Sequence, residues 1–270
     1  PSYSEHLILA TPDNGAAIAL YAACKATLKV ADGQEITLHE QTNYPFEEKI
    51  SFTVNTTEDV RFPFYLRIPS WCDQPELAIN GKQKKIDPIP GKYIYIDRTW
   101  TDGDKVELNL PMKLSIRTWQ VNKNSVSVNY GPLTLSLKIN EEYIQKASRP
   151  TAIYDSRWQE GANATQWPSY EIFPKSPWNY ALVLDSKVPL KNFKVIRKEW
   201  PSDNFPFTVS NVPLEVKAIG KQIPSWTLDK YGLCSELPET NAPKGDREEI
   251  TLIPMGAARL RVSAFPNTYE

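Results

Sequence analysis

The stretch FPFYLRIPSWC, residues 62–72, alternates apolar and other side chains until Pro69 ends the run. Alternation with period two is the pattern of a β-strand that buries one face and leaves the other in water. The same pattern recurs upstream in KISFTV, residues 49–54, and a further strand-like run, YIYIDRTW, follows at residues 93–100. We therefore expect β-strands on both sides of this stretch.

Turn signals separate the expected strands. Asn80-Gly81 tolerates positive φ and predicts a two-residue hairpin turn. The run Thr101-Asp102-Gly103-Asp104 joins aspartates that can bond nearby amides to a glycine that accepts a left-handed conformation. We expect a second hairpin there, between strands at residues 93–100 and 105–110.

Helices are disfavoured by the 23 prolines, because an interior proline removes a backbone donor and clashes with the preceding turn. Residues 16–25 are the one segment with a helical pattern, with Asp13 or Asn14 as a candidate cap. A strand is the alternative reading of that segment.

A chain of 270 residues suits two β-domains of ordinary size. The alternation weakens over residues 111–124 and then returns, so we place a boundary near residue 120. Residues 141–177 read as an irregular loop. Further strands are expected at residues 180–184, 193–200, 214–219, 249–253 and 259–265. This spacing predicts an all-β fold of two consecutive antiparallel β-sandwich, jelly-roll-like domains, residues 1–120 and 121–270.

Charge and composition exclude several classes of function. Lys plus Arg number 31 against 32 Asp plus Glu, so the net charge of −1 gives no bulk attraction to nucleic acid or an anionic membrane. No run approaches the roughly 20 apolar residues that cross a bilayer. Scattered glycines form no phosphate-binding loop. Neutral partners such as glycans fit this composition better.

The order of several segments resembles glycoside hydrolase family 127, the β-L-arabinofuranosidase-like enzymes. The segments that carry the resemblance are ATPDNG (10–15), TNYPFEEKISFTV (42–54), LRIPSWC (66–72), INGK (79–82), GKYIYIDRTWTDGD (91–104), YGPLTLSLK (130–138) and ITLIPMGAARLRVSAFP (250–266). They cover nearly the whole chain. The resemblance implies the carboxyl-terminal β-sandwich region of such an enzyme, with its helical catalytic barrel lying before residue 1.

The mechanism implied by the family uses a zinc-bound cysteine thiolate as nucleophile and a glutamate as acid, with two adjacent cysteines at the metal. No Cys-Cys pair occurs here. Cys24, Cys72 and Cys234 also lack the CxxC or Cys/His spacing of a zinc site. We assign the nucleophile to none of them and expect zinc only in the missing barrel. We expect buried free thiols, with a single disulfide and one leftover thiol as the alternative.

Other catalytic arrangements lack clear candidates. His6 and His39 sit in no recognisable nucleophile motif, although His6 could face the missing barrel. Glycoside hydrolysis usually takes two carboxylates, but Asp102 and Asp104 are explained by hydrogen bonds within their own turn. We read the remaining acidic pairs as solvated strand ends. Those pairs are Glu47-Glu48 and Glu248-Glu249. We predict no catalytic, cofactor-binding or metal-binding residue in the chain.

Aromatic side chains offer the remaining functional route, because a sugar ring can stack on Trp or Tyr. Trp71 and Trp100 belong to strand and turn motifs and are expected to fill cores, and most of the others are expected to do likewise. The candidates for a sugar platform are Trp158, Trp167, Trp178 and Trp226. This pattern alone assigns no binding site.

The sequence therefore predicts the accessory, structural part of a glycoside hydrolase that acts on glycans, with no catalysis by the chain alone. Its partner would be the missing helical barrel; homodimerisation and glycan binding both stay open. The rivals are a free-standing carbohydrate-binding module, which titration with sugars would reveal, and a structural or adhesion protein, which the sequence before Pro1 would decide. Export to the periplasm or outside the cell would be normal for glycan degradation.

Overall fold

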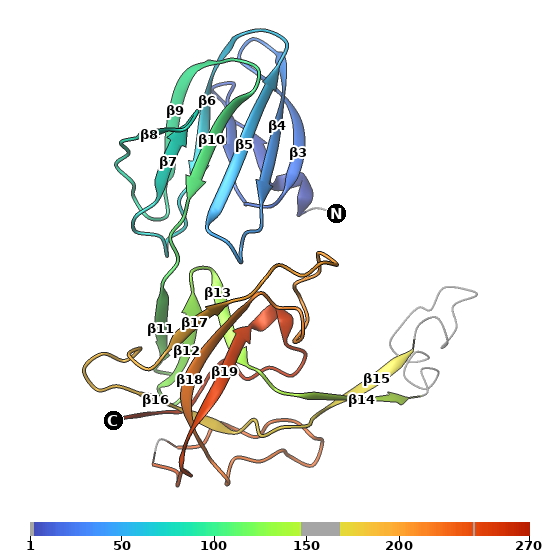
Figure 1. The fold of residues 1–270 in the computed structure, drawn as a ribbon, viewed down its shortest axis with the longest axis vertical. Helices are drawn as coiled ribbons and strands as arrows, with labels where there is room; N and C mark the ends of the chain where they lie inside the picture. The colour runs from blue at the N-terminus through green and yellow to red at the C-terminus, as the bar shows by residue number, and fades with distance from the viewer. Residues whose placement is uncertain (1–2, 147–167, 240) are drawn as a thin grey trace. The chain divides into compact units, whose positions relative to one another are not determined.

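The computed structural model describes residues 3–146, 168–239 and 241–270, and its chain divides into two compact units (Figure 1). The first unit contains the residues up to 114 together with 130–133, and the second contains 115–129 and 134–270. Residue 120, near which a boundary was expected, lies between β11 (Leu114–Trp119) and β12 (Ser125–Tyr130), whereas the main segment of the first unit ends at Leu114.

The first unit is a sandwich of two sheets. Sheet A has the strand order β1-β2-β6-β9, and sheet B has the order β3-β4-β5-β10-β7-β8. Pairing is antiparallel apart from β2 with β6, which run parallel. The elements are η1 (Ser4–His6), β1 (Ile8–Ala10), β2 (Ala16–Ile18), β3 (Cys24–Val30), β4 (Gln34–Thr42), β5 (Lys49–Thr56), β6 (Val60–Arg67), β7 (Glu76–Ile79), β8 (Lys82–Lys84), β9 (Tyr93–Trp100) and β10 (Asp104–Asn109).

Aromatic rings from both sheets meet in the core of the first unit. Phe64 of β6 lies between Phe52 of β5 and Trp100 of β9, at ring-centroid distances of 5.5 and 5.8 Å and nearly perpendicular to both. The indole Nε1 of Trp100, fully buried, donates to the carbonyl of Phe62 at 3.0 Å. Such edge-to-face pairs stabilise a core beyond their burial. The period-two pattern of the sequence therefore places one continuous core between the sheets.

Of the two predicted hairpins, the first is confirmed and the second is wrong. Asn80 and Gly81, with φ of 51° and 72°, join β7 to β8 in an antiparallel pair. Residues 101–103 instead connect the two sheets, because β9 pairs with β6 while β10 pairs with β5 and β7. The turn reverses the chain as expected, but the strand that follows it joins the opposite layer.

The helical reading of residues 16–25 is wrong, and the strand alternative is correct. β2 runs beside β6, and β3 begins at Cys24 and pairs along its length with β4. In the described residues the two helices are three-residue 3-10 turns, and neither could span a membrane.

The second unit contains an eight-stranded sheet and a two-stranded ribbon. The sheet runs β11-β12-β13-β19-β18-β16-β20, with β17 beside β18, and β14 pairs with β15. Every residue of β16 is buried, so this strand is covered on both faces. Beyond β11 and β12, the elements are β13 (Leu133–Leu137), β14 (Glu141–Lys146), β15 (Ser169–Pro174), β16 (Tyr180–Leu184), β17 (Lys194–Arg197), β18 (Leu214–Gln222), β19 (Arg247–Pro254), η2 (Met255–Ala257) and β20 (Asn267–Tyr269).

Two sequence expectations fail in this unit. The described ends of the loop expected at residues 141–177 form the β14–β15 ribbon instead. The strand expected at residues 259–265 is absent there, because side chains take its backbone donors: Glu141 accepts from the amide of Arg259 at 2.9 Å, and Ser136 Oγ accepts from Val262 at 3.0 Å. The all-β class holds across both units.

Candidate functional site

The second unit carries a hollow of about 660 Å³ whose lining is mostly apolar. Residues 171–174 of β15 and residues 231–234 contribute to its lining. Trp178 and Arg261 also line it. Of the two candidate tryptophans that the structure describes, Trp178 and Trp226, Trp178 is the one that lines this hollow.

Trp178 is held in place by Trp226, which is buried beneath it. The two rings meet edge to face at a centroid distance of 5.1 Å and an angle of 68°. Trp226 Nε1 donates to the carbonyl of Ser235 at 3.2 Å, and the Trp226 carbonyl accepts from Asn179 Nδ2 at 3.1 Å. Because Trp226 has these partners, it gives Trp178 a fixed support.

A tight loop presents Tyr231 at the side of the hollow. Asp229 Oδ1 accepts from the amides of Tyr231 and Leu233 at 2.8 and 2.9 Å, and Gly232 takes a φ of 75° at the tip. An aspartate that bonds the amides after it fixes a turn in this way. Tyr231 is consequently held at the surface, with 74% of its area exposed.

The hollow can bury the apolar face of a small ligand. Its volume lies within the roughly 300 to 1,000 Å³ of small-molecule sites. Two charged side chains lie in it and both are engaged: Glu171 with Lys146 at 3.2 Å, and Arg261 Nε with the carbonyl of Ala258 at 2.9 Å. Glu171 is the only acid among the described lining residues, so the lining supplies no carboxylate pair.

The structure describes three of the other five tryptophans discussed above, and all three contribute to cores. Trp226 is buried, in keeping with the expectation that most tryptophans fill cores. Trp100 is fully buried and Trp71 packs against the same core, so both of those predictions are confirmed. Trp158 and Trp167 lie outside the described residues.

The two aspartates of the 101–104 turn are structural. Asp104 Oδ2 accepts from the amide of Thr101 at 3.0 Å and Oδ1 accepts from Asn80 Nδ2 at 2.6 Å. Burial acts to raise the pKa of Asp104, but these hydrogen bonds and Arg98 nearby outweigh it and hold the pKa below its ordinary value. Asp102 Oδ1 accepts from the amide of Thr56 at 3.2 Å. The predicted explanation by local hydrogen bonds is confirmed for Asp104, while Asp102 reaches across to the end of β5.

Glu40 is the acid that sequence reasoning missed. It follows Ile36 and Leu38 on the inward face of β4 and is fully buried in the sandwich. Burial raises its pKa to about 8, against hydrogen bonds from the amide of Ala22 at 3.0 Å and from Cys24 Sγ at 3.9 Å. The alternation itself was the signal, since a carboxyl stands where an apolar side chain is expected. With no exposed surface, Glu40 cannot touch a substrate from outside.

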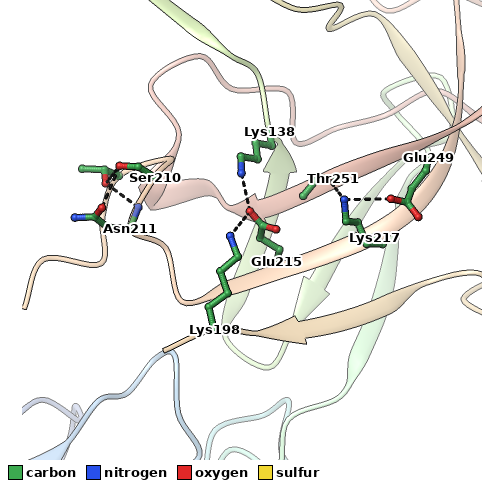
Figure 2. Close-up of polar contacts among 9 residues, drawn as sticks. Lys138, Lys198, Ser210, Asn211, Glu215, Lys217, Glu249 and Thr251 are labelled. Carbon is green, nitrogen blue, oxygen red and sulfur yellow. Dashed lines mark hydrogen bonds and ion pairs between the residues drawn. The ribbon is translucent and has the colours of Figure 1, made fainter. Parts of the chain in front are cut away.

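A second buried acid, Glu215 of β18, lies between two lysines (Figure 2). Lys138 and Lys198 approach the same carboxylate oxygen, Oε1, at 2.7 and 2.6 Å. Burial acts to raise the pKa of Glu215, but the hydrogen bonds from the two lysines outweigh it, so the pKa lies below its ordinary value. This ion cluster ties the ends of β13 and β17 to β18 and is structural.

The histidines and cysteines do not converge on a metal site. His39 is exposed on the outer face of β4, as expected, and His6 is exposed in η1. Cys72 is a buried free thiol as expected, but Cys24 is half-buried and Cys234 is exposed, so that prediction is wrong for Cys234. The described residues contain no group of three or more His, Cys, Asp or Glu side chains that could hold a metal ion.

The fold and these side chains define an all-β protein whose first unit is a two-sheet sandwich. Within that class, residues 15–112 match the family model described as beta-L-arabinofuranosidase, GH127 middle domain. The matched region begins just before β2 and ends just after β10, so it contains most of sheets A and B. The resemblance to glycoside hydrolase family 127 is therefore confirmed. A comparison with curated proteins finds no match.

Three solved structures share the fold over nearly the whole chain. A GH127 β-L-arabinofuranosidase from Geobacillus stearothermophilus T6 is 20% identical, with a TM-score of 0.62 over 99% of this chain and 36% of that one. A protein described as a glycoside hydrolase is 18% identical, with a TM-score of 0.61 over 97% and 37%. A GH127 β-arabinofuranosidase is 20% identical, with a TM-score of 0.58 over 96% and 36%. The chain thus spans little more than a third of each.

Proposed function

We propose that the 270-residue chain forms an accessory, structural part of a glycoside hydrolase acting on glycans of the arabinofuranoside type. In this proposal catalysis resides in another part of the parent protein. The observation that carries the proposal is the match of residues 15–112 to the middle domain of family 127. The description of that domain as a middle domain supports further parts in the parent protein. A helical barrel preceding the chain is the catalytic partner that we propose.

The surroundings of four acidic side chains favour a structural role for the chain. Glu40 has no exposed surface, Asp104 is held by a hydrogen bond within its turn, and Asp102 accepts from the amide of Thr56 at the end of β5. Glu215 is held by two lysines. A hydrolase of the usual kind needs two carboxylates free to face one glycosidic bond. These four acids instead hold the sheets and turns together.

The test compares the 270-residue chain with the same chain extended upstream through its natural sequence. Both are assayed with an aryl β-L-arabinofuranoside and with arabinan oligosaccharides. We expect turnover from the extended protein and none from the 270-residue chain. Hydrolysis by the 270-residue chain alone, at a rate that survives repurification, would defeat the proposal.

Carbohydrate binding is the second candidate function, and the hollow beside Trp178 is the observation that favours it. Trp178 and Tyr231 could stack on a sugar ring while Arg261 bonds a hydroxyl. Calorimetric titration of the 270-residue chain with arabinose and arabino-oligosaccharides tests this function directly. Heat that disappears in Tyr231→Ala and persists in Tyr269→Ala, an exposed tyrosine outside the hollow, would favour it over a purely structural role.

A further inference from the structure

Four exposed apolar side chains line the hollow beside Trp178. Phe173 and Leu228 are each 40% exposed, Leu233 is 64% exposed and Tyr231 is 74% exposed. Single apolar side chains are common on protein surfaces, whereas several gathered in one concave patch mark a binding site. The concentration of these side chains around one hollow therefore indicates a ligand with an apolar body.

Two buried residues, Ile139 and Val262, line the same hollow and join it to the core of the second unit. The amide of Val262 donates to Ser136 Oγ at 3.0 Å, and its carbonyl accepts from the amide of Leu137 at 2.9 Å. The segment that carries Arg261 is therefore fixed to β13. A site that is already ordered loses less conformational entropy when a ligand binds.

Arg261 is the only cation in the described lining of the hollow. Its Nε donates to the carbonyl of Ala258 at 2.9 Å, while its two Nη groups have no partner among the described residues. Glu171, the acid of the lining, is paired with Lys146 at 3.2 Å and not with Arg261. Two neighbouring guanidinium nitrogens form a fork that matches a carboxylate. The hollow thus combines an apolar wall with a site for one anionic group.

An apolar acid fits this lining better than a neutral sugar does. Ile172, Pro174 and Leu260 add side chains that cannot form hydrogen bonds. A sugar ring carries several hydroxyl groups, and each one covered without a partner loses its hydrogen bond to water. An aromatic acid needs only one polar contact, which Arg261 can supply, and the rings around the hollow favour an aromatic body over an aliphatic one.

We propose that the hollow binds a small aromatic carboxylate, with the ligand ring against Trp178 and Tyr231 and its carboxylate on the two Nη groups of Arg261. The support that Trp226 gives to Trp178 holds one ring of this site in place. The proposal rests on the second candidate function only in placing a ligand in this hollow. It names an aromatic acid in place of a neutral sugar, and it does not depend on the hydrolase assignment.

The first experiment compares two ligands that have the same shape and differ in charge. The 270-residue chain is titrated calorimetrically with 3-phenylpropanoate and with the neutral amide 3-phenylpropanamide. The acid should bind about tenfold more tightly than the amide, because a charge-assisted pair with Arg261 is available to the acid alone. Equal affinities, or no heat with either compound, would overturn the inference.

Substitution of the arginine tests the same contact from the side of the protein. Arg261→Gln should weaken binding of the acid about tenfold and leave binding of the amide unchanged. Arg259→Gln is the matched control, because Arg259 is exposed two positions away and does not line the hollow. Tyr231→Ala should weaken both ligands equally, and its exposed side chain makes this variant safe for folding. A preference for the acid that survives in Arg261→Gln would contradict the proposal.

Cys234 provides a reporter inside the hollow, because it is an exposed free thiol that belongs to the lining. Saturating 3-phenylpropanoate should slow alkylation of Cys234 by iodoacetamide severalfold, as read by peptide mass spectrometry. The same concentration of 3-phenylpropanamide should protect it less. Heat of binding without any protection of Cys234 would place the acid elsewhere on the chain and would overturn the assignment.

The inference and the proposed functions fail separately. Heat with arabino-oligosaccharides and none with the acid would overturn the inference and favour carbohydrate binding. Heat with the acid and none with the sugars would support the inference and count against the second candidate function. An extended protein without arabinofuranosidase activity would defeat the hydrolase proposal, while tight binding of the acid to the 270-residue chain would still support the site.

Discussion

Replacing Glu40 by glutamine should stabilise the first unit at neutral pH. The carboxyl has an ordinary pKa of 4.5 and a folded-state pKa of about 8, raised chiefly by burial. Between these values the folded protein keeps the proton and the unfolded chain releases it. The stabilising effect of the neutral acid is therefore complete below pH 4.5 and is lost as the pH rises towards 8.

The magnitude follows from the width of that window. Each unit of pH inside it lowers the free energy of unfolding by about 1.4 kcal/mol. At pH 7 the wild-type chain has lost on the order of 3 kcal/mol relative to a neutral side chain at this position. Glutamine keeps the shape and an oxygen for the amide of Ala22, so a Glu40→Gln variant should recover most of this amount.

Urea unfolding of wild type and variant at pH 5, 6, 7 and 8 is the assay. The wild-type free energy of unfolding for the first unit should fall across this range relative to that of Glu40→Gln, so the two curves diverge. Glu35→Gln is the matched control, because Glu35 lies on the same strand but is exposed. Parallel curves for wild type and Glu40→Gln would refute the argument that a buried, protonated carboxyl sits in this core.

Three further outcomes are expected. Glu215→Gln should lower the free energy of unfolding, measured with urea at pH 7, by about 1 to 3 kcal/mol, because two partly exposed lysines lose their shared partner. Because the folded-state pKa of Glu215 is lowered, the stabilisation that its carboxylate gives the wild type should be lost as the pH falls below the ordinary value of 4.5. Gly81→Ala should lower the free energy of unfolding of the first unit, measured by thermal denaturation, by about 1 to 2 kcal/mol, because φ is 72° there. An unchanged free energy would argue against the turn. Under native conditions iodoacetamide should modify exposed Cys234 first and Cys72 only on unfolding, as read by peptide mass spectrometry; early labelling of Cys72 would contradict its burial.

Local signals predicted the parts of the fold that local chemistry determines. Asn80-Gly81 sets its own backbone conformation, so its hairpin follows from two residues. The hairpin predicted at residues 101–104 was wrong because the residues of a turn determine that the chain reverses, and they do not determine which sheet the next strand joins. That choice depends on β5 and β7, which leave a place for β10 between them. Pairings of this kind lie beyond any short window.

The candidate site depended even more on distant residues. The sequence singled out Trp178 but carried no sign that Trp226, 48 positions later, supports it from below. The segment at residues 259–265 looked like a strand because its apolar residues alternate. Its amides are instead taken by Glu141 and Ser136, far away in the sequence. Glu40 was readable in principle, since the β4 alternation places it inside the sandwich.

The place of β10 in sheet B has a consequence for biosynthesis. β10 lies between β5 and β7, so β5 keeps an unpaired edge towards that gap until residue 109 has been translated. Exposed strand edges invite pairing with other chains. A nascent chain arrested before β10 should therefore expose a strand edge that other chains can pair with, and the last strand of the first unit to leave the ribosome closes its sheet.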